Sequence, residues 1–311
     1  MAETTDPRAL ASLPPVAAGL GQALGRPVAL AMACLIALVG LGWITLAVMV
    51  AGWAARHGAG ALGPGMGALD FLAEPGGRDL IGRALLDVVC RPGFGQLGWS
   101  VTDAALAFLM WAAMTLAMML PSAGPMIVTY AQIADTAARQ REPAVSPVIL
   151  TAGYVGVWIG FAAAAVLLQA ALTRLALLEP AMVSASPLFS GAIFIGAGAY
   201  QFSQLKQACV THCQRPFPFF FANWSTERRA IFGLGMRQGL YCLGCCWAAM
   251  MVMFAVGVMN VVWMAALGSV MTAEKMATTT RLCRIVGIAF LVIGTVFIAG
   301  SVAAYWPRAM L

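Results

Sequence analysis

The sequence predicts an all-α fold, a polytopic bundle of about six to seven membrane-spanning segments. Of its 311 residues, 61% are hydrophobic and only 10% are charged. A typical soluble domain carries about 25% charged residues. Apolar stretches long enough to cross roughly 30 Å of hydrocarbon recur along the chain, and Lys and Arg gather in the connections between them. The net charge of +6 is therefore typical of membrane-flanking loops, and it does not indicate a nucleic-acid partner.

Composition divides the chain into four parts. Residues 1–27 carry several prolines and are expected to form a flexible tail. Residues 28–94 contain the first transmembrane helix and a loop rich in Gly and Pro. Residues 95–306 form the main membrane domain, and 307–311 are a short tail. All of the candidate metal-binding motifs lie in the main membrane domain.

Single crossings are expected wherever an apolar stretch has the length of one membrane span. These stretches are residues 28–53, 99–120, 147–172, 187–205 and 285–306. Pro121 and Pro125 should break or kink the second span. The fourth should continue as helix until Pro216 ends it.

The stretch 240–272 would be about 50 Å long as one helix, more than a single crossing requires. Gly257 and Asn260 offer a break, so we expect a helical hairpin near 240–273. With a hairpin, the 18 Lys and Arg residues are divided more unevenly between the two membrane sides than with a single crossing. Because basic residues gather on the cytoplasmic side, the hairpin favours a cytoplasmic N-terminus and an external C-terminus. Four basic residues are expected to lie at anionic lipid headgroups: Lys206, Arg215, Arg228 and Arg229.

Three thiols open the longest uncharged stretch, in the sequence CLGCC at Cys242, Cys245 and Cys246. Each helical residue turns about 100°, so the three lie within roughly one quadrant of a helix. Soft sulfur ligands on one face indicate a soft metal, with Cu(I) first. The alternative is that these cysteines are small apolar residues that fill space.

A second triple repeats this spacing at Cys209, His212 and Cys213. Met114 and Met118 share one face of the second span. The expected topology brings all three groups to one membrane surface, where they would form a joint metal site. Four sulfur or nitrogen ligands would suit zinc, and two or three sulfurs would suit Cu(I). The abundance of Met favours copper over zinc.

Three stretches resemble a family of bacterial integral membrane proteins described as predicted metal-binding, a domain of unknown function. They are MWAAMTLAMMLPSAGPM, QLKQACVTHCQRP and GLYCLGCCWAAMMVMFAVGVMNVVWMAAL followed by EK, and they cover about residues 95–285. The resemblance implies a multi-pass inner-membrane protein with a metal site at Cys209, Cys213, Cys242, Cys245 and Cys246. It implies no reaction.

These observations favour a bacterial inner-membrane protein that binds a soft metal, with copper as the favoured ion. The protein would serve metal handling or the maturation of a metalloprotein. Its partners would be the lipid bilayer and a protein that receives the metal or is assembled with it. No phosphorylation motif or nucleotide-binding loop is present, so an enzymatic pump is not favoured. Two alternatives remain open: a membrane thiol–disulfide oxidoreductase, and a structural membrane subunit without metal.

Overall fold

The computed structural model describes residues 27–68, 99–179, 182–277 and 279–305. Within these ranges the regular elements are helices, with one isolated bridge between Leu178 and Ser184 and no strand. The predicted all-α class is confirmed. Almost all of the predicted N-terminal tail, much of the loop before residue 94 and all of the C-terminal tail lie outside the described residues.

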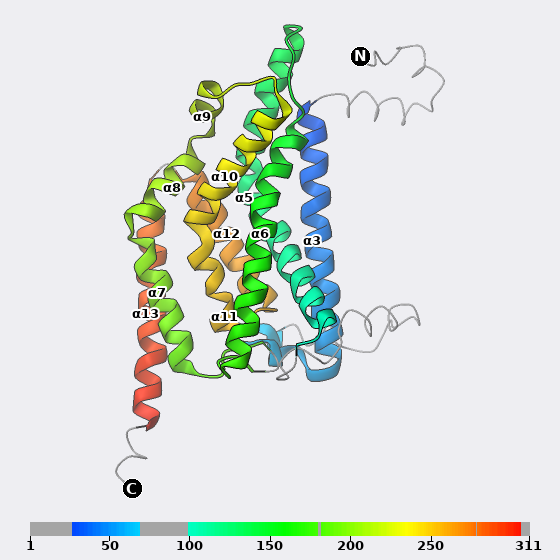
Figure 1. Ribbon diagram of the computed structural model, residues 1–311. Coiled ribbons are helices and arrows are strands. Elements are labelled where there is room, and N and C mark those ends of the chain that lie inside the picture. The colour runs from blue at the N-terminus through cyan, green and yellow to red at the C-terminus, as the bar shows by residue number, and fades with distance from the viewer. Residues whose placement is uncertain (1–26, 69–98, 180–181, 278, 306–311) are drawn as a thin grey trace.

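Four long helices form one side of the bundle (Figure 1). They are α3 (Pro27–His57), α5 (Val101–Arg139), α6 (Pro147–Arg174) and α10 (Arg228–Met251). Helix α5 packs against α3 and α6, and α6 packs against α10. Helices α5 and α10 are therefore surrounded by other helices. Side chains on their buried faces can form a binding site inside the bundle.

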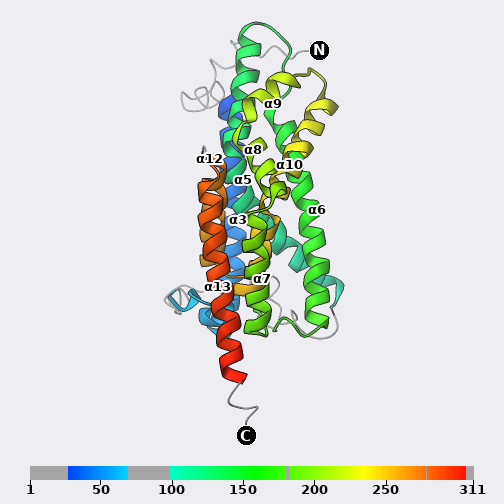
Figure 2. The same cartoon turned by 90° about the vertical axis from the view of Figure 1, so that its left-hand side faces the viewer.

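The remaining helices close the other side. α7 (Pro187–Gln201) packs against the C-terminal α13 (Arg281–Tyr305), as the turned view shows (Figure 2). α8 (Gln204–Gln214) and the short α9 (Pro216–Ala222) lead from α7 to α10. α12 (Val261–Met276) lies against both α5 and α8.

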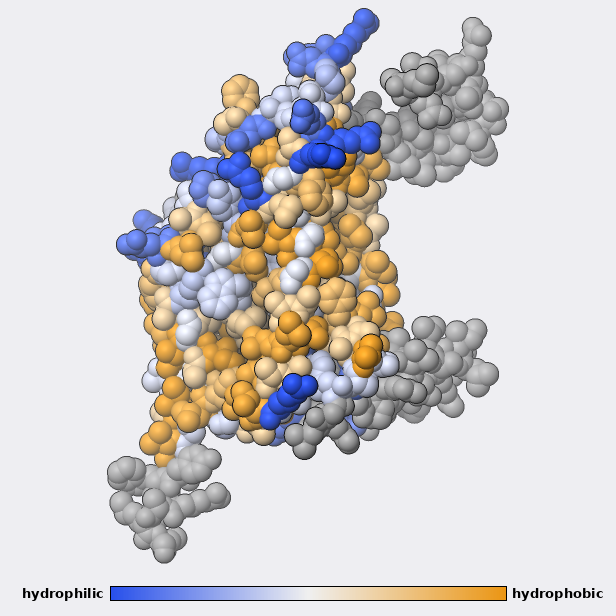
Figure 3. All heavy atoms as spheres, in the orientation of Figure 1, coloured by the Kyte–Doolittle hydropathy of each residue, from blue (hydrophilic) through white to orange (hydrophobic). Residues whose placement is uncertain are grey.

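Five of the described helices are long and apolar enough to cross a membrane. These five stretches are Val28–Ala54, Val101–Arg139, Pro147–Arg174, Arg228–Val256 and Arg281–Ala303. In the view of Figure 3 the flank of the molecule is mostly apolar, and hydrophilic residues gather at its upper end. That end carries α9 and the ends of α5 and α10 (Figure 1).

The expected hairpin is present. α10 is followed by the short α11 (Met253–Val256), and the chain reverses at Gly257, whose φ of +107° favours glycine. Asn260 then caps α12, because its Oδ1 accepts from the Trp263 N–H at 3.1 Å. Its Nδ2 donates to the Pro64 carbonyl at 3.0 Å, which ties the turn to the chain after α3.

Two details of the helices differ from the prediction. The break that was one of the two alternatives at Pro121 and Pro125 is absent, because α5 continues as one helix through both. Neighbouring helices hold it on both sides, and a proline removes only one N–H donor. The fourth span does not continue to Pro216 as one helix. It ends at Gln201, and Ser203 caps a new helix by accepting from the Lys206 N–H at 3.1 Å.

Glycines allow α6 and α10 to approach closely. A Cβ added at Gly235 would lie 2.0 Å from the Leu150 carbonyl oxygen, and one added at Gly153 would lie 2.2 Å from that of Phe232. Backbone atoms cannot yield as a flexible side chain does, so these glycines set the distance between the helices.

We therefore expect Gly235→Ala to lower the free energy of unfolding by about 1–3 kcal/mol, a typical cost of overpacking. Gly233→Ala is the matched control, because a Cβ there meets nothing within 4 Å. The melting temperature of each purified variant measures the difference. Equal melting temperatures would show that the helices separate without cost.

Candidate metal centre

The thiols of Cys242, Cys245 and Cys246 form a compact buried group on α10. Their sulfur atoms all lie within 4.8 Å of one another, and the Cys245 and Cys246 sulfurs are 3.3 Å apart. Each side chain is at most 2% exposed. As the sequence predicted, the helical spacing places the three thiols on one face of α10. That face is buried in the bundle.

A lysine from α12 reaches the first of these thiols. Lys275 Nζ donates to Cys242 Sγ at 2.8 Å and to Ser122 Oγ at 2.6 Å. The hydroxyl of Tyr154 lies 2.9 Å from the same sulfur and donates to the Met119 carbonyl at 3.1 Å. Groups from α5, α6 and α12 therefore surround Cys242, which lies on α10.

Lys275 has no carboxylate partner among the described residues. A buried ammonium without a counter-charge is costly, and the nearest group that can carry negative charge is the Cys242 thiol. The contact at 2.8 Å therefore favours a thiolate at Cys242. A thiolate is the form of cysteine that binds metals.

The other buried lysine is already neutralised. Lys206 Nζ lies 2.6 Å from Glu274 Oε2, and both side chains are 1% exposed. Burial has the largest effect on the pKa of Lys206 and lowers it, but the Glu274 carboxylate together with the nearby Cys246 and Cys245 raises it, so the net pKa is raised. Lys206 therefore cannot lie at lipid headgroups as the sequence suggested. Its charge is balanced in the ion pair, whereas Lys275 donates a hydrogen bond directly to a thiol.

The second triple lies beside the first but is not merged with it. Cys213 lies close enough to Cys245 to interact with it, and it borders the same narrow cleft as Cys242 and Lys275. Cys209 packs against the backbone of α10, where a Cβ added at Gly244 would meet its sulfur at 2.6 Å. His212 is exposed and stacks on Tyr241, with ring centroids 4.4 Å apart. Among the described His, Cys, Asp and Glu residues, none other than the α10 cysteines belongs to the compact group.

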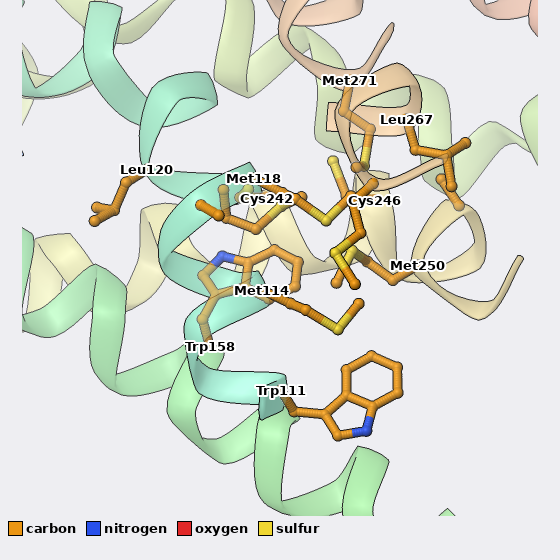
Figure 4. Packing of buried hydrophobic residues seen from close by; sticks show 14 of the residues in the cluster. Trp111, Met114, Met118, Leu120, Trp158, Cys242, Cys246, Met250, Leu267 and Met271 are labelled. Atoms are coloured by element: carbon orange, nitrogen blue, oxygen red, sulfur yellow. The ribbon is translucent and has the colours of Figure 1, made fainter. Parts of the chain in front are cut away.

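Both predicted methionines face the core near these thiols. Met114 and Met118 are at most 1% exposed. Figure 4 shows them on α5, projecting toward the space beside Cys246. Met250 and Met271, which the sequence analysis did not select, point into the same region from α10 and α12.

The donor set fits a soft monovalent ion. With metal–sulfur bonds of roughly 2.3 Å, two sulfurs on one ion lie about 4.0 Å apart in trigonal and about 4.6 Å apart in linear geometry. The three thiols lie within 4.8 Å of one another, and the closest pair, Cys245 and Cys246, is 3.3 Å apart, so small shifts of the side chains would let them share one ion. The cleft that reaches Cys242 has a volume of about 10 Å³, about the space that one water molecule needs.

Sequence reasoning missed Lys275, Ser122 and Tyr154. The signal for Lys275 was present, because the pair Glu274–Lys275 directly follows an apolar stretch. Charged residues in that place ordinarily mark the end of a membrane span. Only the reversal of the chain at Gly257 shows that Lys275 turns back toward Cys242. Ser122 and Tyr154 carried no comparable signal, since isolated Ser and Tyr are common in membrane helices.

A group of buried thiols, with a cation beside it and thioethers below it, defines a candidate soft-metal centre in a bundle of apolar helices. A family model described as "PpoB2: Copper chaperone" matches residues 108–297. This range is more than half of the chain and includes every predicted ligand, so the chain belongs to the PpoB2 copper chaperone family. The metal-binding class expected from the resemblance agrees with this family. No curated protein and no solved structure matches the chain.

Proposed function

We propose that this protein is a multi-pass protein of the bacterial inner membrane that receives Cu(I) at Cys242, Cys245 and Cys246 and passes it to an acceptor protein. The observation that carries the proposal is the compact thiol group in a member of a copper chaperone family. The five apolar helices support placement in the membrane.

Copper in this proposal is cargo. Two thiolates and one Cu(I) carry a net charge of −1, and Lys275 brings the total to zero. A neutral centre is the least costly one in an apolar bundle. Zn²⁺ would need a third thiolate to reach the same balance, and it prefers a fourth ligand as well. The predicted preference for copper over zinc therefore gains support from the charge of Lys275.

Cys213 is proposed as the entry ligand. It borders the cleft that leads to Cys242 and is only partly buried, so an arriving ion would meet it first. Cys209 remains a proposed accessory ligand. Its sulfur would reach the ion only after a small rotation of α8. His212 would have to leave its stacking contact with Tyr241 to take part.

The proposal is tested with full-length protein purified in detergent under anaerobic conditions and titrated with Cu(I) against a chromophoric Cu(I) chelator. We expect a tightly bound Cu(I) in the wild type and its loss in the triple variant Cys242/Cys245/Cys246→Ser. The variant Cys34/Cys283→Ser is the matched control, because both residues are described free cysteines outside the α10 group.

Loss of copper in the control as well would point to a general folding defect, which the melting temperature of each variant separates from loss of ligands. Retention of tight Cu(I) in a folded triple variant would overturn the proposal. It would then favour the structural subunit without a thiol metal centre.

A further inference from the structure

The sulfur atoms of this protein extend beyond the thiol group along three helices. On α10, Cys242, Cys246 and Met250 follow each other at intervals of four residues, so they share one face and each step rises about 6 Å. On α5 the same interval separates Met114 from Met118. Facing stripes of this kind predict a continuous column of sulfur.

α12 supplies the third stripe. Met264 and Met271 are seven residues apart and therefore lie on one face, and both are at most 1% exposed. α12 contacts α5 here, because a Cβ at Gly268 would lie at ordinary van der Waals distance, 3.5 Å, from the Cβ of Met118. The two sulfur-bearing faces therefore meet at this point.

Figure 4 shows the outcome of this packing. Met114, Met118, Met250 and Met271 project from α5, α10 and α12 into one region around Cys246. All four are at most 1% exposed. Methionine often serves as an adaptable core residue, but here four thioethers adjoin a thiol group.

We propose that Met114, Met118, Met250 and Met271 form a second, weaker Cu(I) site that takes the ion from the α10 cysteines. Thioethers are soft, neutral ligands that select Cu(I) over harder divalent ions. A neutral ligand set leaves the ion with its single positive charge, so it holds copper less tightly than thiolates do. This inference rests on the proposed function of the cysteine group and extends it.

The transfer is a ligand exchange. A bond from copper to a thioether sulfur forms as a bond from copper to a cysteine sulfur breaks, and the cysteine keeps its electron pair. Copper remains Cu(I), and no oxidant or reductant is needed. Cys246 is the donor nearest to the thioethers on α10, because it lies one turn before Met250.

An open space lies next to the proposed site. A cavity of about 430 Å³ between α3, α5 and α12 has Met118 in its wall, together with Trp43 and Gly268. Met118 therefore belongs both to the group of four thioethers and to the wall of this open space. A weaker site at this position would release copper more readily than the buried thiols.

The test is an anaerobic Cu(I) titration of full-length protein in detergent against chelators of graded affinity. We expect two bound Cu(I) per chain in the wild type, one tight and one weaker. The variant Met114/Met118/Met250/Met271→Leu should lose only the weaker ion, since Met→Leu preserves volume. The cysteine variant Cys242/Cys245/Cys246→Ser should lose only the tight ion.

Met49/Met66→Leu is the matched control, because these methionines are equally buried away from the thiol group and should leave both ions in place. If the quadruple variant does not fold, each pair, Met114/Met118 and Met250/Met271, is changed alone and should weaken the second ion at least tenfold. A folded Met→Leu variant that retains both ions overturns the thioether site while leaving the cysteine centre intact. A cysteine variant that keeps its tight ion contradicts the proposed function instead.

Discussion

Replacing Lys275 with Gln should weaken Cu(I) binding by about 10–100-fold, the usual effect of removing a group that supports a metal ligand. Lys275 Nζ lies 2.8 Å from Cys242 Sγ and has no carboxylate partner among the described residues. Its ammonium therefore offsets the negative charge of the thiolates in an apolar setting. Gln keeps a hydrogen-bonding group, lacks this charge and brings no sulfur ligand to the site.

Competition titration with a Cu(I) chelator measures the change. Lys275→Arg is the control that keeps the charge, and it should retain most of the affinity if the cleft accommodates the larger group. Ser122→Ala removes only one acceptor of Lys275, at 2.6 Å, and should have a smaller effect. Lys275→Gln protein that binds Cu(I) as tightly as the wild type would show that the ammonium is not a counter-charge.

Local sequence was sufficient to predict the cysteine group. Cys242, Cys245 and Cys246 belong to one helix, and the helical repeat fixes how their side chains are placed relative to one another. The hairpin was also predictable, because a stretch too long for one crossing contained Gly257 and Asn260 as candidates for a break. Both inferences depend on residues near one another in the chain.

The second triple shows where this reasoning ends. Cys209, His212 and Cys213 share the helical spacing of the first triple, but spacing does not fix how α8 is rotated against α10. All three residues contact α10, but at different places. Cys209 lies at Gly244 and Cys213 lies at Cys245, whereas the exposed His212 stacks on Tyr241, away from the thiols.

The buried charges were hidden for a different reason. Lys206 and Glu274 are separated by 68 positions, and Lys275 and Cys242 by 33. Their pairing depends on how α8, α10 and α12 pack, which no local pattern encodes. From the sequence alone each looked like a charge at the end of a span, where solvent or headgroups would neutralise it.

The ion pair between Lys206 and Glu274 leads to the second large prediction. We expect Lys206→Met and Glu274→Gln each to lower the free energy of unfolding by about 3–5 kcal/mol, because each leaves an unpaired charge in the core. Both side chains are 1% exposed and their charged atoms are 2.6 Å apart. Glu274 Oε1 already lacks a hydrogen-bond partner, so its carboxylate depends on Lys206.

The exposed pair Arg139–Asp135 is the matched control. Its arginine side chain is 74% exposed, so Arg139→Met should change stability by less than about 1 kcal/mol. Melting temperatures followed by tryptophan fluorescence compare the variants. The double variant Lys206→Met/Glu274→Met should recover most of the loss, since it buries no charge, and it should still bind Cu(I) because the thiols and Lys275 are unchanged. If Lys206→Met alone is as stable as the wild type, Glu274 is neutral in the folded protein and the pair is not ionic.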